Sequence, residues 1–194
     1  MPEMTSFGQA FCRSAPWRWF ARHALLPWAL QGEQLSGDVV EIGSGSGAMA
    51  AEVLRRFPDV QLTATDYDHA MVEGARDRLL DFDDRVDVKQ ADATQLPFPD
   101  EAFDTVLSFI MLHHVIDWEK ALAEAVRVLR PGGRLLGFDL LDNPSAHWFH
   151  RAERSPHRMM RWDELRRETQ KLPLLGVLNS GVGAFTAPFD LVKR

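Results

Sequence analysis

Three glycines in the run VVEIGSGSGAMA have the spacing of a ligand-binding turn. Gly43, Gly45 and Gly47 follow a β-branched apolar run and precede small residues that favour a helix. A strand that turns sharply into a helix brings bare backbone and helix N–H groups close to a polar ligand. The turn could therefore hold a dinucleotide, a phosphate or another polar group, or it could simply let the strand and the helix pack closely.

Asp66 is a second residue whose type and spacing suggest chemistry. It ends the next expected strand, about 20 residues after the turn, where a carboxylate can bind ribose hydroxyl groups. The segment 43–48 also satisfies the dinucleotide pattern G-x-G-x-x-G/A. Turn and acid together indicate an adenosine-bearing ligand, but they do not distinguish a nicotinamide cofactor from other ligands of that kind.

Histidines are the candidates for a general base, because their unperturbed pKa is about 6.5. Five of the seven occur in two stretches, His113 and His114, and then His147, His150 and His157. His147 and His150 have the spacing of a metal pair on one helix face. No Cys, Asp or Glu accompanies them at ligand spacing, so we expect no metal.

Strand-like and helix-like patterns alternate along most of the chain. Strands are expected over 39–42, 61–65, 86–89, 105–110 and 134–140, and helices over 48–57, 69–80 and 118–129. This alternation predicts right-handed crossovers and a parallel sheet with helices on both faces, a doubly wound α/β fold. Farther on, a helix is expected over 163–170, followed by two strands around a turn at 180–183.

The composition limits the class of protein. A chain of 194 residues can form one domain with a substantial core. Its net charge of −6 argues against non-specific nucleic-acid binding. Cys12 is the single cysteine, so an intrachain disulfide is impossible and a reducing compartment is expected. No apolar run has membrane-spanning length, and the N-terminus lacks the order of a signal peptide. We expect a cytoplasmic protein without stable membrane insertion.

Further motifs follow in a fixed order. They are Gln90-Ala91-Asp92-Ala93, LPFPDEAFD at 96–104, Met111-Leu112-His113-His114-Val115 and Val128-Leu129-Arg130-Pro131-Gly132-Gly133. Together with the glycine turn and Asp66, they resemble class I S-adenosylmethionine-dependent methyltransferases, in the branch of quinone and sterol methylases. The resemblance covers residues 39–141. It implies a Rossmann-like methyltransferase fold, with a mostly parallel seven-stranded sheet and an antiparallel C-terminal strand.

The resemblance implies S-adenosylmethionine as the cofactor and S-adenosylhomocysteine as its product. In the family, the glycine turn lies beneath the methionine part of the cofactor. Glu41 is similar to the acid near the cofactor's amino end. Tyr67 offers a surface for adenine, Asp92 matches the acceptor for the adenine amino group, and Phe109 lies where carbonyls face the ammonium group. The predicted cofactor-binding residues are Glu41, Gly43, Ser44, Gly45, Gly47, Asp66, Tyr67, Asp92, Ala93, Phe109 and Ile110. For Asp66 and Asp92 the alternative is a cap or turn role.

Methyl transfer from a sulfonium is an in-line displacement in which the cofactor carries its own leaving group. The protein mainly aligns donor and acceptor, although a hydroxyl, thiol or acidic carbon must also lose a proton to a base. His113 is the candidate catalytic base. The pair His113-His114 is similar to one found in relatives with different acceptors, which favours a role in shaping the cofactor site over catalysis.

Two segments are candidates for the acceptor side. The segment 15–30 holds three of the six tryptophans and only cationic charges, and it could line a pocket for a flat apolar molecule. Membrane contact and simple packing on the sheet are the alternatives. We favour packing combined with a lid, and Pro27 is expected to end or kink the helix. The segment 142–162 is the other wall. Its arginines, at 151, 154, 158 and 161, could meet an acidic acceptor or form a solvated face.

The expected organisation is a single methyltransferase domain over 1–194. It comprises an N-terminal helical lid (1–36), a cofactor-binding core (37–141), and an acceptor-side loop with terminal strands (142–194). The run at 174–177 replaces the family's usual Gly-Phe entry to the sixth strand, so the acceptor pocket departs from the family pattern.

We predict transfer of a methyl group from S-adenosylmethionine to a small apolar or aromatic acceptor. A non-catalytic S-adenosylmethionine-binding protein is the main alternative. A nicotinamide-dependent reductase is disfavoured because Tyr67 is the only tyrosine and forms no Tyr-x-x-x-Lys pair. The expected partner is a small molecule and not nucleic acid, and a homodimer is left open. The acceptor and the methylated atom do not follow from the sequence.

Overall fold

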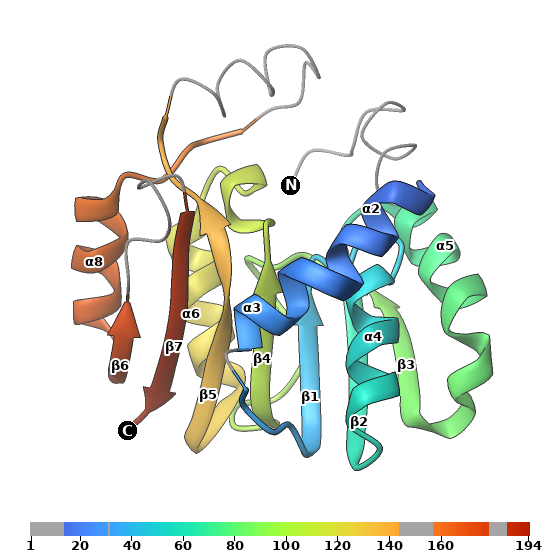
Figure 1. Cartoon of the computed structure of the whole chain (residues 1–194). Helices are drawn as coiled ribbons and strands as arrows, with labels where there is room; N and C mark the ends of the chain where they lie inside the picture. Colours follow the sequence, from blue (N-terminus) through green and yellow to red (C-terminus); the bar gives the residue numbers. More distant parts are fainter. Residues whose placement is uncertain (1–13, 31, 144–156, 179–185) are drawn as a thin grey trace.

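The computed structural model describes residues 14–30, 32–143, 157–178 and 186–194, which contain a seven-stranded sheet flanked by helices (Figure 1). The strands are β1 (Gly37–Ile42), β2 (Val60–Asp66), β3 (Val86–Gln90), β4 (Phe103–Phe109), β5 (Leu129–Leu140), β6 (Leu174–Leu178) and β7 (Thr186–Lys193). Their order is β3-β2-β1-β4-β5-β7-β6. Strand β7 runs antiparallel to both neighbours, and the other pairs are parallel. The predicted doubly wound α/β fold with an antiparallel C-terminal strand is confirmed.

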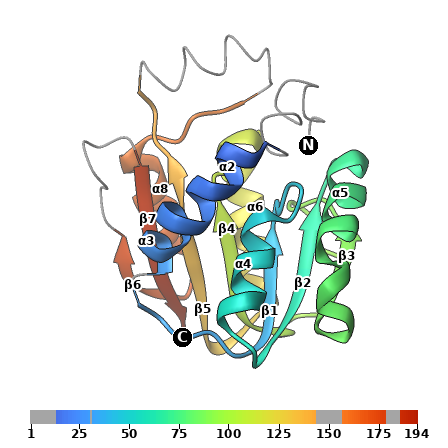
Figure 2. The same ribbon diagram turned by 45° about the vertical axis from the view of Figure 1, so that its right-hand side comes forward.

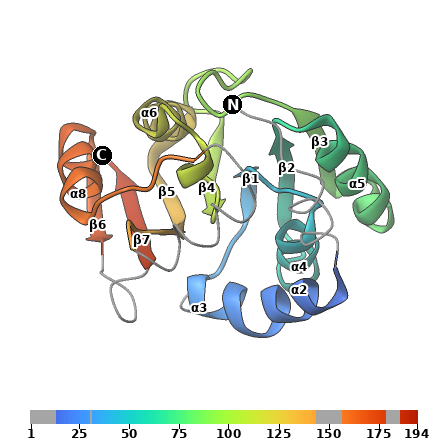
Figure 3. The same ribbon diagram turned by 90° about the horizontal axis from the view of Figure 1, so that it is seen from above.

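Helices cover both faces of the sheet. One face carries α2 (Ala15–Phe20), a π-helical turn (Ala21–Leu25), α3 (Leu26–Leu30), α4 (Ala48–Arg56) and α5 (His69–Leu79). The other carries α6 (Trp118–Val128) and α8 (Trp162–Lys171). Figure 3, seen from above, shows these two groups on opposite sides of the strands. Two short 3₁₀ segments complete the described elements, η2 (Leu80–Arg85) and η3 (Leu112–His114).

Each face of the sheet has its own hydrophobic core, because neighbouring residues of a strand point to opposite faces. In β1, Val39 packs with Leu54 of α4, whereas Val40 belongs to the cluster of Trp118 in α6. All four of these side chains are essentially inaccessible to solvent. The two cores fix the register of the parallel strands, so the ends of β1, β4 and β5 lie along one edge of the sheet (Figure 1).

Pro27 was expected to end or kink the N-terminal helix, and it does not end it, because the helix runs on through Pro27. Pro27 lies within α3, and the helix continues to Leu30. Proline lacks an N–H donor, and its ring crowds the carbonyl four residues earlier. The π-helical turn Ala21–Leu25 lies directly before it and accommodates this mismatch in a wider turn. Figure 2 shows the whole helix lying across the sheet beside α4.

Other boundaries differ by a few residues from the predictions. Strand β5 begins at Leu129 and not at Arg134, with an irregular pairing to β4 between Phe103 and Thr105. The Pro131-Gly132-Gly133 stretch falls within this irregular part, and α6 ends before it as expected. The helix expected over 163–170 is α8, and the two expected terminal strands are β6 and β7. The turn expected at 180–183 lies outside the described residues.

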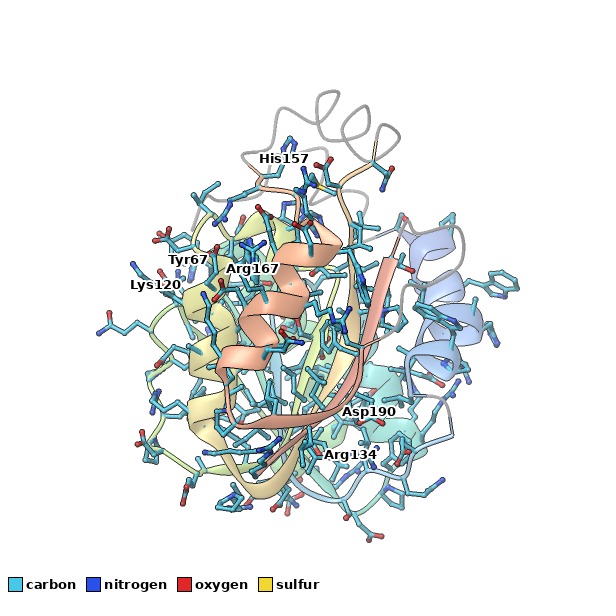
Figure 4. The ribbon with its side chains drawn as sticks, turned by 90° about the vertical axis from the view of Figure 1, so that its left-hand side faces the viewer. Tyr67, Lys120, Arg134, His157, Arg167 and Asp190 are labelled. Atoms are coloured by element: carbon cyan, nitrogen blue, oxygen red, sulfur yellow. The ribbon has the colours of Figure 1, made fainter. Side chains whose placement is uncertain are left out.

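Ion pairs stabilise the edge of the sheet where β1, β4 and β5 begin. Arg130 bridges Asp38 and Asp104, each at 2.8 Å, and Asp104 also accepts from the backbone N–H of Asp38 at 2.9 Å. Arg134 of β5 pairs with Asp190 of β7 at 2.6 Å, as Figure 4 shows. These contacts lie at the edge of the sheet opposite the glycine turn, so they stabilise the fold without taking part in the candidate site.

Candidate functional site

The glycine turn connects the end of β1 to the start of α4. Gly43 and Gly45 have φ angles of 69° and 54°, which only glycine adopts readily. A Cβ on Gly43 would lie 2.6 Å from Cβ of Met111, whereas one on Gly45 would meet nothing within 4 Å. Gly43 is therefore packed against the protein, and Gly45 presents open backbone on the side where a ligand can approach.

Asp66 holds the glycine turn in place. One carboxylate oxygen accepts from the N–H of Gly45 at 2.8 Å, and the other accepts from the N–H of Asp68 at 2.9 Å. Burial raises the pKa of Asp66, while these backbone donors lower it. The helix-capping role belongs to Asp68, whose side chain accepts from the first turn of α5. A carboxylate has about four acceptor positions, so Asp66 keeps capacity for ribose hydroxyls.

Glu41 is a buried carboxyl group next to the turn. Its side chain is 1% exposed, and Oε2 has no hydrogen-bond partner among the described residues. Burial, with a smaller contribution from Asp66, raises the pKa of Glu41 from 4.5 to about 8. The buried hydroxyl of Ser44 also has no described partner. Burying such groups costs free energy unless a partner arrives, so the site fits a ligand that brings a cation or hydrogen-bond donors.

Asp92 lies near Asp66 because β2 and β3 are neighbours. The carbonyl of Asp66 accepts from the N–H of Ala91 at 2.9 Å, and Asp92 follows directly. Asp92 accepts from the N–H and the hydroxyl of Thr94 at 2.8 and 2.7 Å, so it also has a turn role. The carbonyl of Tyr67 accepts from the side-chain amide of Gln90 at 2.8 Å.

The residues predicted to bind the adenine lie along one edge of the sheet. Tyr67 follows the end of β2, and Asp92 and Ala93 follow the end of β3. The side chain of Ala93 is buried in the core on the α6 face. The structure thus brings these three residues to the same edge as the glycine turn.

Phe109 ends β4, and Ile110 follows it directly. Phe109 packs against Phe138 of β5, with ring centroids 5.9 Å apart. Ile110 has a φ angle of 53°, an uncommon and strained conformation for a β-branched residue. Its N–H donates to the carbonyl of Phe138 at 2.9 Å. The strained residue turns the chain back over the end of the sheet, towards Met111 and the glycine turn.

His113 is completely buried, and its Nδ1 lies 2.5 Å from a carboxylate oxygen of Asp139. Its ring centroid is 4.1 Å from that of His114. These contacts are those of a residue that shapes the site, and a role as catalytic base stays a prediction. Asp139 was missed from the sequence, although an acid inside the apolar run LLGFDL was a signal for it.

The N-terminal helix packs on the sheet next to this site. Leu26 and Leu30 are buried, and Trp28 meets Phe138 edge-on, with centroids 5.0 Å apart. Trp19, farther along the helix, is 65% exposed. Packing on the sheet is thus part of this segment's role, and its function as a lid stays a prediction. In the described part of the chain, no helix is long and apolar enough to cross a membrane.

The arginines of the acceptor-side segment are engaged where they are described. The guanidinium group of Arg158 binds Glu119 at 2.7 Å, and the backbone N–H of Arg158 donates to the carbonyl of His113 at 2.9 Å. Arg161 contacts Asp163 at 3.1 Å. These pairings favour a structural role over capture of an acidic acceptor. The arginines at 151 and 154 and the histidines at 147 and 150 lie outside the described residues.

His157 lies at the far end of the molecule from Arg134 in Figure 4. Within the described residues, no group of three or more His, Cys, Asp or Glu side chains is arranged to hold a metal ion.

The sheet order, the glycine turn and the acids beside it define the Rossmann-like class of nucleoside-binding folds. Residues 40–137, half of the chain, match the family described as "Methyltransferase domain". The chain therefore belongs to this family of S-adenosylmethionine-dependent methyltransferases, and the predicted cofactor, S-adenosylmethionine, is confirmed.

Known proteins resemble the chain in sequence and in fold. A 27-O-demethylrifamycin SV methyltransferase from Amycolatopsis mediterranei (strain S699) is 42% identical over 113 residues, which cover 57% of this chain and 41% of that protein. A ubiquinone/menaquinone biosynthesis C-methyltransferase from Desulfotalea psychrophila (strain LSv54 / DSM 12343) is 36% identical over 111 residues, covering 57% and 44%. The crystal structure of a SAM-dependent methyltransferase from Aquifex aeolicus has a TM-score of 0.77 at 16% identity, covering 99% of this chain and 100% of that chain. The chain spans less than half the length of the two sequence relatives.

Proposed function

We propose that this protein transfers a methyl group from S-adenosylmethionine to a small apolar or aromatic acceptor. The buried carboxyl group of Glu41, whose Oε2 has no hydrogen-bond partner among the described residues, is the observation that carries the proposal. A buried acid beside open glycine backbone suits a ligand that ends in an ammonium group, as the methionine part of this cofactor does.

Each residue of the site has a distinct role in this proposal. Glu41 receives the ammonium group, and the open backbone at Gly45 lets the ligand approach closely. Asp66 accepts from the ribose hydroxyls while it holds the turn through the N–H of Gly45. Asp92 accepts from the adenine amino group, beside the surface of Tyr67. The bound cofactor supplies the methyl group and its own leaving group, so the protein mainly orients donor and acceptor.

An apolar or aromatic acceptor is supported by the exposed aromatic ring of Trp19, which lies in α2 on the helix that packs beside α4. Rigid aromatic surfaces favour flat apolar molecules. One relative is named for O-methylation of a rifamycin, and the other for C-methylation in ubiquinone and menaquinone biosynthesis. These names support an acceptor of this kind and leave the methylated atom open.

A turnover assay tests the proposal against its alternatives. The protein is incubated with S-adenosylmethionine and a panel of phenols, naphthols and hydroquinones, and S-adenosylhomocysteine and methylated product are both quantified. Product that depends on one class of acceptor, and that is lost in Asp66→Ala, supports the proposal. Tight binding of S-adenosylmethionine with no turnover on any acceptor of the panel would favour the non-catalytic alternative. A cytoplasmic location, a homodimer and the segment boundaries at 36 and 141 stay predictions.

A further inference from the structure

Asp139 is a buried carboxylate at the carboxyl end of β5, and every contact it makes is with the polypeptide around it. Its side chain is completely inaccessible to solvent. One oxygen accepts from the N–H groups of Met111 and Leu112 at 3.0 and 2.6 Å. The other accepts from the N–H of Leu140 at 2.7 Å and contacts Nδ1 of His113 at 2.5 Å. Together these four contacts occupy both oxygens of the carboxylate.

Three of the four contacts of Asp139 go to one short piece of chain, residues Ile110–His114, which we call the strap. The strap follows β4 and includes the 3₁₀ turn η3. It begins at Ile110, whose φ angle of 53° is unfavourable for a β-branched residue. Such a conformation persists only when surrounding contacts impose it. The carboxylate of Asp139 supplies these contacts to the N–H groups that follow Ile110.

The strap in turn contacts the glycine turn. Met111 packs so closely on Gly43 that a Cβ there would lie 2.6 Å from Cβ of Met111. The strap also reaches the acceptor side, because the carbonyl of His113 accepts from the N–H of Arg158 at 2.9 Å. The position of the strap therefore affects both the cradle of the cofactor and the segment that begins at residue 157.

We propose that Asp139 is a positioning residue for the cofactor: it fixes the strap, and through the contact of Met111 with Gly43 the strap fixes the glycine turn. Asp139 holds the strap through its contacts with the side chain of His113 and with the backbone N–H groups of Met111 and Leu112. This inference rests on the proposed cofactor site.

The expected effect on binding follows from these contacts. Without the carboxylate, two buried N–H groups lose their acceptor, and the strap has less to offset the strain at Ile110. The glycine turn then loses its fixed neighbour Met111. Dissociation constants for S-adenosylmethionine and S-adenosylhomocysteine should rise at least about tenfold in Asp139→Ala, the factor that corresponds to one hydrogen bond to a charged group.

Three variants test this by calorimetric titration with S-adenosylhomocysteine. Asp139→Ala removes all four contacts. Asp139→Asn keeps one carbonyl oxygen, which can still accept from Met111 and Leu112, and should bind more tightly than Asp139→Ala. The matched control is Asp104→Asn. This change removes the charge of an acid that, like Asp139, accepts from a backbone N–H, but that lies at the opposite edge of the sheet. It should lower the melting temperature and leave the dissociation constant unchanged.

The outcomes separate this inference from the proposed function. If the unaltered protein does not bind, the proposed site is wrong. If it binds and folded Asp139→Ala binds equally well, or if Asp104→Asn weakens binding to the same extent, the role of Asp139 is wrong. Amide hydrogen exchange of the unaltered protein decides the question should Asp139→Ala not fold. S-adenosylhomocysteine should slow exchange in the strap but not at the amino end of β5, and an unchanged strap would overturn the proposal.

Discussion

The N–H of Gly45 donates to a carboxylate oxygen of Asp66 at 2.8 Å, which joins the two motifs that the sequence placed 21 positions apart. Asp66 therefore has a structural task before any ligand arrives. Its two oxygens hold the glycine turn and the start of the segment after β2. The ribose-binding role proposed for this acid is built on a carboxylate that the protein has already oriented.

Replacing Asp66 should affect both stability and binding. Asp66→Ala leaves the N–H of Gly45 without its acceptor, and it also removes the proposed ribose contacts. Binding of S-adenosylhomocysteine should weaken by about 1–3 kcal/mol, the range for a buried hydrogen bond that is lost. Calorimetry gives the affinity and thermal unfolding gives the stability. Unchanged affinity in a destabilised protein would leave Asp66 with a structural role alone.

The raised pKa of Glu41 should make the free energy of unfolding depend on pH in the absence of ligand. Burial, with Asp66 nearby, raises its pKa from 4.5 to about 8. Between these values the folded state holds a proton that the unfolded state releases, so the contribution of Glu41 to the free energy of unfolding is highest at low pH and falls as the pH rises. From pH 5 to 8 the loss should be about 3 kcal/mol for this group.

Denaturant titrations across this pH range check the sign. Glu41→Gln has no titrating group at position 41, so its free energy of unfolding should depend less steeply on pH than that of the unaltered protein. The result that would contradict the account is an identical pH profile in the two proteins, because the buried carboxyl would then not be the source of the effect.

Two glycines of the turn should respond differently to alanine. A Cβ on Gly43 would overlap Met111, whereas a Cβ on Gly45 would enter open space. Both residues have positive φ, so each change carries a backbone cost of about 1 kcal/mol. Gly43→Ala should lower stability by clearly more than Gly45→Ala. Gly45→Ala should weaken cofactor binding while the protein stays folded, and equal effects of the two changes on stability would refute this assignment.

At position 110, glycine should give a more stable protein than alanine, the reverse of the usual order. Alanine removes its side chain but leaves a Cβ at a φ angle of 53°, whereas glycine removes both the side chain and the strain. Ile110→Gly should therefore be more stable than Ile110→Ala by about 1 kcal/mol. Urea unfolding of the two variants measures the difference. The opposite order, normal for extended or helical positions, would show that the residue is not strained.

The periodic parts of the fold were predictable from the sequence because each core position repeats at the period of its element. The strand of Val39 and Val40 alternates between two faces, and the helix that starts at Trp118 has one apolar face. Pro27 does not end the helix, one of its two expected effects, because a π-helical turn accommodates it, and such a turn has no local sequence signal. The structure of the site was only partly predictable.

Asp66 and the glycines could be found from the sequence because their spacing is set by one strand–helix–strand unit, β1, α4 and β2. The apolar run around Asp139 was a signal for a buried acid, but its partners could not be found from the sequence, since Met111, Leu112 and His113 lie more than 25 positions away along the chain. The fully buried, unpartnered oxygen of Glu41 likewise appears only once neighbouring strands are assembled. Tertiary contacts, which no local pattern encodes, decide which polar residues are buried and what they bind.

Calorimetric titration of the dialysed protein with S-adenosylmethionine, S-adenosylhomocysteine and NADH tests the central claim most directly. The account predicts saturable binding of the first two ligands, with no binding of NADH, and a marked loss of affinity for both in Gly45→Ala. Binding of NADH alone, or S-adenosylhomocysteine affinity that is unaffected in Gly45→Ala, would contradict it.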